Sequence, residues 1–163
     1  IQVVEQSTTT STSTTVQSLM KRQFPFSCSA SSSLGDGWSC EKIYDNEPSS
    51  WQDKSLECAD ATLEFTFSKD VYFEFLTYEN LDDSKSFKRN FKPRDILITS
   101  EEEGFSIEYE LENQNTSTQW IDLNTTTSVI TIQILSAYPG EEVNGAEAFP
   151  ECAIQEITFY GRG

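Results

Sequence analysis

The sequence predicts an all-β domain, a sandwich or jelly roll of about eight short antiparallel strands. Three observations predict it. Apolar side chains alternate every second residue over much of the chain, turn signals separate the alternating runs, and only residues 41–45 favour a helical turn. Alternation with period two places one set of side chains on a buried face of each strand and the other set on the opposite face.

The first 23 residues differ from the rest. Every residue from Ser7 to Thr15 is Ser or Thr, a run that has no apolar face to bury. We therefore expect residues 1–23 to be an extended stalk, O-glycosylated or not, or an interaction arm, and residues 24–163 to be the folded domain. In an interaction arm the anchoring apolar side chains would be Val3, Val4, Val16 and Leu19.

The strands are predicted where apolar residues alternate. Short turns separate them: a hairpin connection at Ser68–Asp70, an acidic loop at Ser100–Gly104, and Pro139-Gly140 after the longest run. Trp120 lies within a predicted strand and is expected in the core. The alternating runs are 62–67, 71–75, 96–98, 105–111, 121–123, 130–134 and 157–159.

The charge of the chain limits its partners. With 27 acidic and 11 basic residues the formal net charge is −16, which repels phosphate backbones and anionic lipids. We expect neither nucleic-acid binding nor membrane insertion, and no apolar run approaches the roughly 18 residues of a membrane span. The same charge attracts cations such as Ca²⁺, although acidic surfaces also simply keep a protein soluble.

Four cysteines, Cys28, Cys40, Cys58 and Cys152, are widely spaced, and the chain has no His and no C-x-x-C pair. This pattern favours two disulfides in a secreted protein over a zinc site, and over free buried thiols in a cytosolic one. Three pairings are possible. If the two ends of the sandwich meet, Cys152 pairs with Cys28 or Cys40. Two sequons, at Asn115 and Asn124, agree with secretion and with N-glycosylation.

Several segments together resemble the discoidin-like (coagulation-factor C type) galactose-binding domains. The opening is similar to their A-S-S … L-x-D-G-x-P-x-T-x-W motif, and the ending to their A-I-S-E-I-x-F-Y-G last strand. Two further segments resemble the NADase-type glycan-binding branch. The resemblance covers roughly Phe26 to Gly161 and rests on 30–34, 42–51 and 152–161 for the ends, and on 89–90 and 134–140 for the branch.

The resemblance implies an eight-stranded jelly roll whose ends lie close together, and a Ca²⁺ between the opening loop and the last strand. Hard Ca²⁺ takes six to eight oxygen ligands, a mixture of carboxylates and carbonyls. Asn46 stands where the family has Gly, Ser50 replaces Thr, and the Trp lies one residue nearer the Asp. The alternative is a turn held by the side chains of residues 45 and 46 without an ion. The implied ligands are Asp45, Glu47, Ser50 and Glu156.

Sugar recognition needs an aromatic platform and polar groups for the hydroxyls. Aromatic residues in or beside predicted loops supply the first, and a basic loop supplies the second, since an Arg can bind a uronate or sulfate through two bonds. Either tryptophan could instead be a core residue at the sheet end. The candidate ligand-binding residues are Trp38, Trp51, Tyr78, Arg89 and Asn90, with Lys85 and Lys88 nearby.

Two functions from different classes follow. The first is a non-catalytic secreted module that binds a glycan and serves in adhesion. The second is a structural subunit of an extracellular filament or matrix, in which the N-terminal segment adds a strand to a neighbouring identical subunit. An enzyme is not expected, because the chain has no His for a nucleophilic triad and no nucleotide-binding loop.

Overall fold

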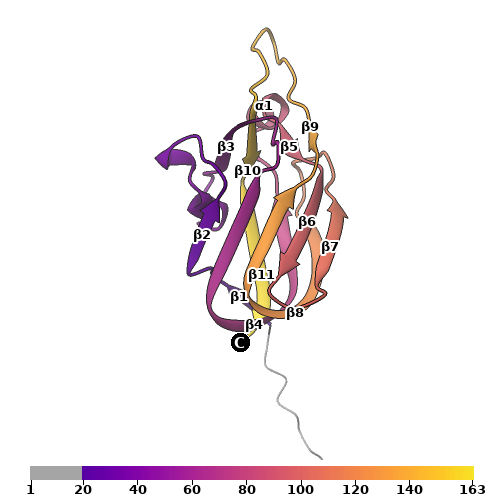
Figure 1. Cartoon of the computed structure of the whole chain (residues 1–163). Coiled ribbons are helices and arrows are strands. Elements are labelled where there is room, and N and C mark those ends of the chain that lie inside the picture. The colour runs from indigo at the N-terminus through magenta and orange to yellow at the C-terminus, as the bar shows by residue number, and fades with distance from the viewer. Residues whose placement is uncertain (1–19) are drawn as a thin grey trace, which may run out of the picture.

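Two long strands organise the fold. Strands β4 (Thr62–Glu79) and β8 (Gln119–Ile134) pair antiparallel along almost their whole length. The structure is a computed structural model that describes residues 20–163, so residues 1–19 of the predicted arm lie outside it, and residues 21–23 of that arm form β1. Figure 1 shows the two strands running through the centre of the molecule, with shorter strands on either side.

The pairing register divides the main sheet into two facing layers. The first part of β4 pairs with β2 and with the end of β8, which continues to β6 and β7. The second part of β4 pairs with β11 and with the start of β8, and β11 carries β1 at the edge. The shorter strands of this sheet are β1 (Lys21–Gln23), β2 (Ser27–Ala30), β6 (Asp95–Ser100), β7 (Ser106–Glu110) and β11 (Glu156–Arg162).

One predicted turn is wrong. Ser68–Asp70 does not join two hairpin strands, because β4 continues through these residues and keeps β8 as its partner on both sides. The pairs Thr66↔Val129 and Val71↔Thr127 show that four residues of β4 lie opposite a single residue of β8. Such an irregularity bends a strand, and here it carries β4 from one layer into the other.

The core fills the space between the layers, as the alternation predicts. Phe65 of one layer meets Phe159 of the other with ring centroids 5.0 Å apart, and Phe67 lies 5.2 Å from the same ring. All three rings are buried. Edge-to-face packing of this kind adds stability beyond the area buried.

Short elements cover the upper end of the sandwich in Figure 1. Two small sheets lie there, β10 with β3 and β5 with β9. The predicted helical turn at residues 41–45 is a 3₁₀ turn that begins one residue earlier. In residues 20–163 no helix is long and apolar enough to cross a bilayer. The elements are η1 (Asp36–Trp38), η2 (Cys40–Ile43), β3 (Trp51–Leu56), α1 (Ser84–Arg89), β5 (Lys92–Pro93), β9 (Ala137–Tyr138) and β10 (Glu151–Ile154).

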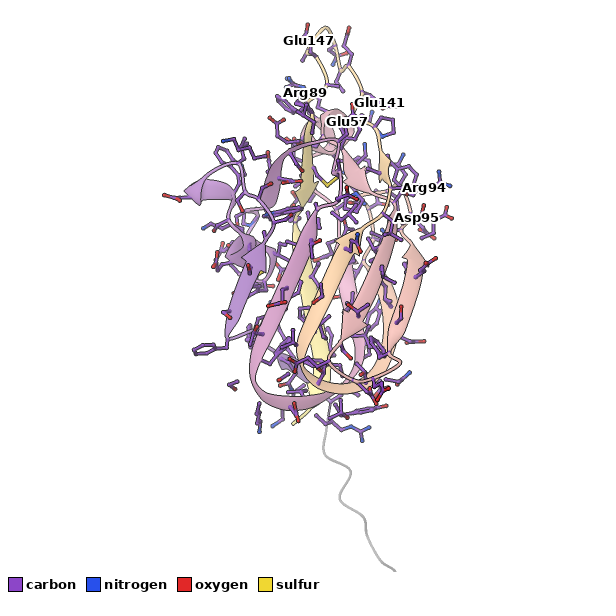
Figure 2. The ribbon with its side chains drawn as sticks, viewed as in Figure 1. Glu57, Arg89, Arg94, Asp95, Glu141 and Glu147 are labelled. Atoms are coloured by element: carbon purple, nitrogen blue, oxygen red, sulfur yellow. A yellow bond between two sulfur atoms is a disulfide. The ribbon has the colours of Figure 1, made fainter. Side chains whose placement is uncertain are left out.

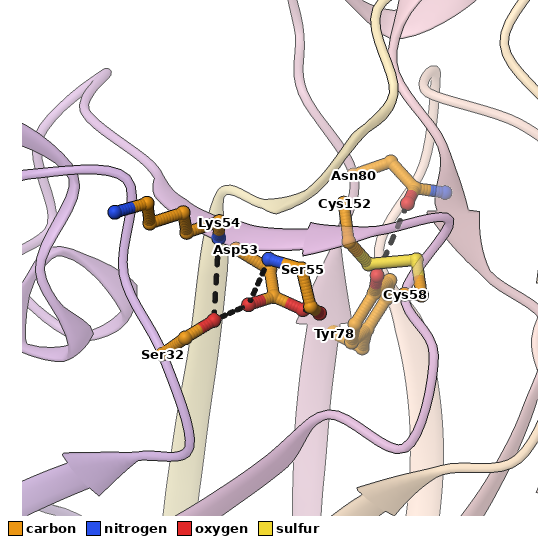
Figure 3. Close-up of a disulfide and its surroundings, with 8 residues drawn as sticks. All are labelled: Ser32, Asp53, Lys54, Ser55, Cys58, Tyr78, Asn80 and Cys152. Atoms are coloured by element: carbon orange, nitrogen blue, oxygen red, sulfur yellow. Dashed lines mark hydrogen bonds between the residues drawn. A yellow bond between two sulfur atoms is a disulfide. The ribbon is translucent and has the colours of Figure 1, made fainter.

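Both disulfides form, but Cys152 does not pair as expected. The bonds are Cys28–Cys40 and Cys58–Cys152. The ends of the domain do meet, since β1 pairs with β11. Cys152, however, lies in β10, which precedes β11 in the chain. Its neighbouring strand is β3, and Cys58 follows β3 (Figure 3).

The two disulfides are expected to differ in stabilisation. Cys58–Cys152 joins residues 94 apart in the chain and Cys28–Cys40 joins residues 12 apart. From loop entropy, the longer closure stabilises by about 4.7 kcal/mol and the shorter by about 2.8 kcal/mol. In urea unfolding of the Cys58→Ala/Cys152→Ala and Cys28→Ala/Cys40→Ala variants, the first should therefore lose more unfolding free energy. A larger loss in the second variant would contradict this ranking.

Candidate functional site

A hollow of about 260 Å³ at the upper end of the sandwich contains two of the predicted ligand-binding residues. Trp38 ends η1 and keeps 43% of its surface exposed, and Asn90 follows α1. We call this feature the Trp38 hollow. It is lined by Leu34, Trp38, Gln52, Ser86, Asn90, Phe149 and Glu151.

The segment that carries Trp38 is fixed to β3 by hydrogen bonds. The Trp51 indole Nε1 donates to the Ser32 carbonyl (3.1 Å), and the Leu34 N–H donates to the Gln52 carbonyl (2.8 Å). On the other side of Trp38, Cys40 is bonded to Cys28 in β2. The indole of Trp38 therefore projects from a loop that is tied at both ends.

A buried carboxylate strengthens this attachment. Asp53 in β3 has no exposed surface, and it accepts hydrogen bonds from the Ser32 hydroxyl and from both the N–H and the hydroxyl of Ser55 (Figure 3). The Ser32 hydroxyl oxygen also accepts the N–H of Lys54 (3.3 Å). Because a buried charge is tolerated only when it is fully bonded, this network fixes the position of Ser32 on β3.

Phe149 forms the opposite wall, and Arg89 supports it. The Arg89 guanidinium lies over the Phe149 ring, 3.8 Å from its centroid, and its Nε donates to the Glu147 carbonyl (2.8 Å). The Phe149 N–H donates to the Arg89 carbonyl (2.7 Å). Figure 2 shows Arg89 beneath the loop that carries Glu147. Arg89 was a candidate for direct ligand contact, but here it holds the wall and is not itself a lining residue.

Asn90 lines the hollow and has a hydrogen-bond acceptor without a partner. Its side chain is 2% exposed, and its Nδ2 donates to the Ser86 carbonyl (2.9 Å), which fixes the orientation of the amide. Its Oδ1 is the one buried side-chain oxygen or nitrogen in residues 20–163 without a hydrogen-bond partner. Leaving such an atom unpaired costs roughly 1–3 kcal/mol, so its retention needs an explanation.

The other two candidates lie in the core. Trp51 and Tyr78 are 0% and 1% exposed, so neither ring can serve as a platform for a ligand. Burial also raises the pKa of Tyr78 far above its ordinary value. The Tyr78 hydroxyl instead donates to Asn80 (3.2 Å). For Trp51 the alternative interpretation, a core residue at the sheet end, is the one that the structure has.

Trp120 is the reverse case, because it was expected in the core and is 61% exposed. Ile121 and Leu123 point inward, so strand alternation places Trp120 on the outer face, a signal that the sequence already contained. Its ring packs on Phe75 (4.9 Å between centroids), which stacks in turn on Tyr160 (4.8 Å). These three rings form a row across β8, β4 and β11, away from the Trp38 hollow.

The residues expected to bind Ca²⁺ lie near one another but are already bonded to protein groups. Asp45 accepts the Glu47 N–H (3.0 Å) and the Ser49 hydroxyl (2.5 Å). Ser50 is buried, and its hydroxyl accepts the Gln52 side-chain amide at 3.5 Å. Among residues 20–163 there is no group of three or more acidic or cysteine side chains placed to hold a metal ion. Binding of Ca²⁺ by the expected set stays a prediction.

Glu156 has a cationic partner within the chain. Its carboxylate accepts one hydrogen bond from the Arg22 guanidinium (3.0 Å) and one from the Asn46 N–H (3.2 Å). Burial raises the pKa of Glu156 to about 7, while the charge of Arg22 and the Asn46 hydrogen bond act in the opposite direction. Asn46 has a φ of 58°, the left-handed conformation that allows it to stand in place of Gly.

The two sequons lie in different surroundings. Asn115 is half-buried and its amide donates to the Asp82 carbonyl (3.2 Å). Asn124 is exposed, and its amide oxygen accepts the Tyr72 hydroxyl (3.0 Å), which leaves its nitrogen free of that bond. Attachment of a glycan to either residue stays a prediction.

Comparison with solved structures supports the fold that this geometry defines. No protein-family model matches the sequence, and no curated protein matches it. The family 32 carbohydrate-binding module of C. perfringens NanJ, solved with galactose, is 14% identical, with a TM-score of 0.61 over 82% of this chain and 92% of that one. The F5/8 type C domain of a Bacteroides fragilis protein is 12% identical, with a TM-score of 0.56 over 83% and 91%.

A third structure, truncated AlyQ with CBM32 and alginate lyase domains, is 12% identical and has a TM-score of 0.61. It covers 90% of this chain, which spans 35% of AlyQ. Together these likenesses show that the chain has the discoidin-like β-sandwich fold that the sequence motifs predict.

Asp53→Ala is expected to destabilise the domain by about 3 kcal/mol, because it removes the buried acceptor of the half-buried hydroxyl and N–H donors of Ser32 and Ser55. Urea unfolding measures the loss. Glu64→Ala, which changes an exposed carboxylate in β4, is the matched control and should stay within about 0.5 kcal/mol of the wild type. Equal effects of the two substitutions would show that the Asp53 network contributes nothing.

Proposed function

We propose that this chain is a non-catalytic, secreted carbohydrate-binding module and that the sugar binds in the Trp38 hollow. The observation that carries the proposal is the meeting of two partly exposed aromatic side chains, Trp38 and Phe149, in one hollow that the fixed amide of Asn90 also lines. Aromatic faces suit the C–H side of a pyranose ring, and a fixed polar group selects the orientation of a hydroxyl.

The polar lining suits a ligand rich in hydroxyl groups. Gln52 and Ser86 provide both donors and acceptors, and Glu151 provides an acceptor. The hollow is smaller than the roughly 300–1,000 Å³ typical of pockets for drug-sized ligands. A single sugar residue, such as the end of a glycan chain, therefore fits it better than an enclosed oligosaccharide. The galactose bound to the similar NanJ module is of this size class.

The same lining argues against glycoside hydrolysis. Glu151 is the single carboxylate among the lining residues, whereas most glycosidases place two carboxylates about 5–10 Å apart around the bond that they cleave. Secretion is supported by the two disulfides, which persist in oxidising compartments. We therefore assign the hollow to recognition and not to catalysis.

Trp38→Ala and Phe149→Ala should each weaken sugar binding roughly 10- to 100-fold, because each removes a stacking surface that the ligand covers. A glycan array identifies the sugars that the wild-type chain binds, and titration calorimetry with the strongest of them measures the change. Trp120→Ala removes an exposed indole outside the hollow and should leave the affinity unchanged. No array signal from the wild type, or an equal loss in the Trp120→Ala variant, would contradict the proposal.

The alternative, a subunit of an extracellular filament or matrix, is favoured by one observation. Among residues 20–163, strand β1 lies at the edge of its sheet and pairs on one side with β11. An open edge can accept a strand from another chain, and residues 1–19 directly precede β1. A head-to-tail exchange of this kind does not close, so it would build a filament.

In the filament alternative, the full chain should form concentration-dependent polymers that electron microscopy and light scattering detect. Deletion of residues 1–19, which leaves β1 intact, should leave a monomer. A full-length chain that stays monomeric at high concentration would remove the alternative. This result would leave carbohydrate binding unaffected, since the Trp38 hollow lies on other strands.

A further inference from the structure

Arg22 stands where three separate segments of the chain meet. It belongs to β1, where it pairs with Tyr160 of β11. Its guanidinium donates to the Glu156 carboxylate (3.0 Å), to the Asn46 side-chain oxygen (3.3 Å) and to the Tyr44 carbonyl (3.4 Å). One side chain thus joins the edge strand, the opening loop and the start of the last strand.

The partners of Arg22 are the kinds of oxygen that a hard cation would take. They comprise a carboxylate, an amide oxygen and a backbone carbonyl, a mixture typical of Ca²⁺ sites. The Arg22 guanidinium places a positive charge among these oxygens, and this charge is covalently part of the chain.

The geometry leaves little for a metal ion to replace. The Arg22 side chain keeps only 24% of its surface exposed and that of Glu156 keeps 6%, so the ion pair is largely shielded from water. The other expected carboxylate, that of Asp45, is held by donors of its own loop. To bind Ca²⁺ at the Glu156 carboxylate and the Tyr44 carbonyl, the chain would have to displace the Arg22 guanidinium.

We propose that the Arg22 guanidinium is the built-in cation of this sandwich: it closes the junction that the family resemblance assigns to Ca²⁺, so the closure does not depend on calcium. One consequence concerns the N-terminal segment. Arg22 lies in β1, at the end of that segment, so the same contacts anchor the base of the segment to the domain. This proposal holds whether the Trp38 hollow binds a sugar or not.

Thermal unfolding of the full chain tests the proposal. The wild-type melting temperature should differ by less than about 1 °C between excess CaCl₂ and EDTA, because no ligand binds the native state at this junction. Arg22→Gln should lower it by about 5 °C or more in EDTA, because a shielded carboxylate loses its partner. Arg162→Gln is the matched control. Arg162 lies in β11, the partner strand of β1, and its guanidinium lies over the Tyr72 ring as that of Arg22 lies over Phe24, but it makes no ion pair in the described residues.

The double variant separates the ion pair from general damage. In Arg22→Gln/Glu156→Gln the losses of the single variants should not add, because each single change already breaks the same pair. Calcium titration by calorimetry completes the test. A calcium-induced rise in the wild-type melting temperature that Glu156→Gln abolishes would overturn the proposal, as would an Arg22→Gln variant no less stable than Arg162→Gln. Calcium binding that survives Glu156→Gln lies elsewhere on this acidic chain and is compatible with the proposal.

Discussion

The pairing of β4 with β8 is the constraint on which the rest of the structure depends. These strands belong to both layers, so their register sets which strands can join each layer and which side chains face the core. Because side chains alternate with period two, a slip of one residue would turn Phe65 and Ile130, which are now fully buried, toward solvent. The irregularity after Thr66 and the left-handed Asn124 let both strands bend without losing each other.

The same constraint places the two sites at different junctions. Where the chain leaves the paired strands at the upper end, three loops meet and form the Trp38 hollow, and hydrogen bonds to β3 and α1 hold them. The junction around Glu156 lies where β11 begins, beside the opening loop and the edge strand. Each junction contains one buried polar side chain. Within the described residues, the Glu156 carboxylate has Arg22 as a partner, whereas the Asn90 Oδ1 has none.

The sequence predicted the features that a local pattern of residues determines. It missed the features that contacts between distant residues determine. Alternating apolar residues located β4, β6, β7, β11 and both ends of β8, but not the short strands β1 and β2 of the same sheet. The middle of β8 was not predicted as a strand, because its inward residues, Thr125 and Thr127, are polar and give no apolar alternation. Trp38 and Asn90 were found as loop residues of the right chemistry. Phe149 was not, since its segment has no periodicity and its position is set by bonds to Arg89, some 60 residues away.

The role of Arg22 is likewise set by contacts between distant residues. Nothing in the residues around it distinguishes it from a surface arginine, and its role arises only because β1 joins β11 beside the opening loop. In a chain of net charge −16, a cation beside a shielded carboxylate stabilises its ionised form. A free metal ion does this at the cost of depending on its concentration, whereas a guanidinium in a paired strand is present whenever the strand is folded. The substitution makes closure of the domain a property of the chain alone, and it ties that closure to the strand through which the N-terminal segment enters.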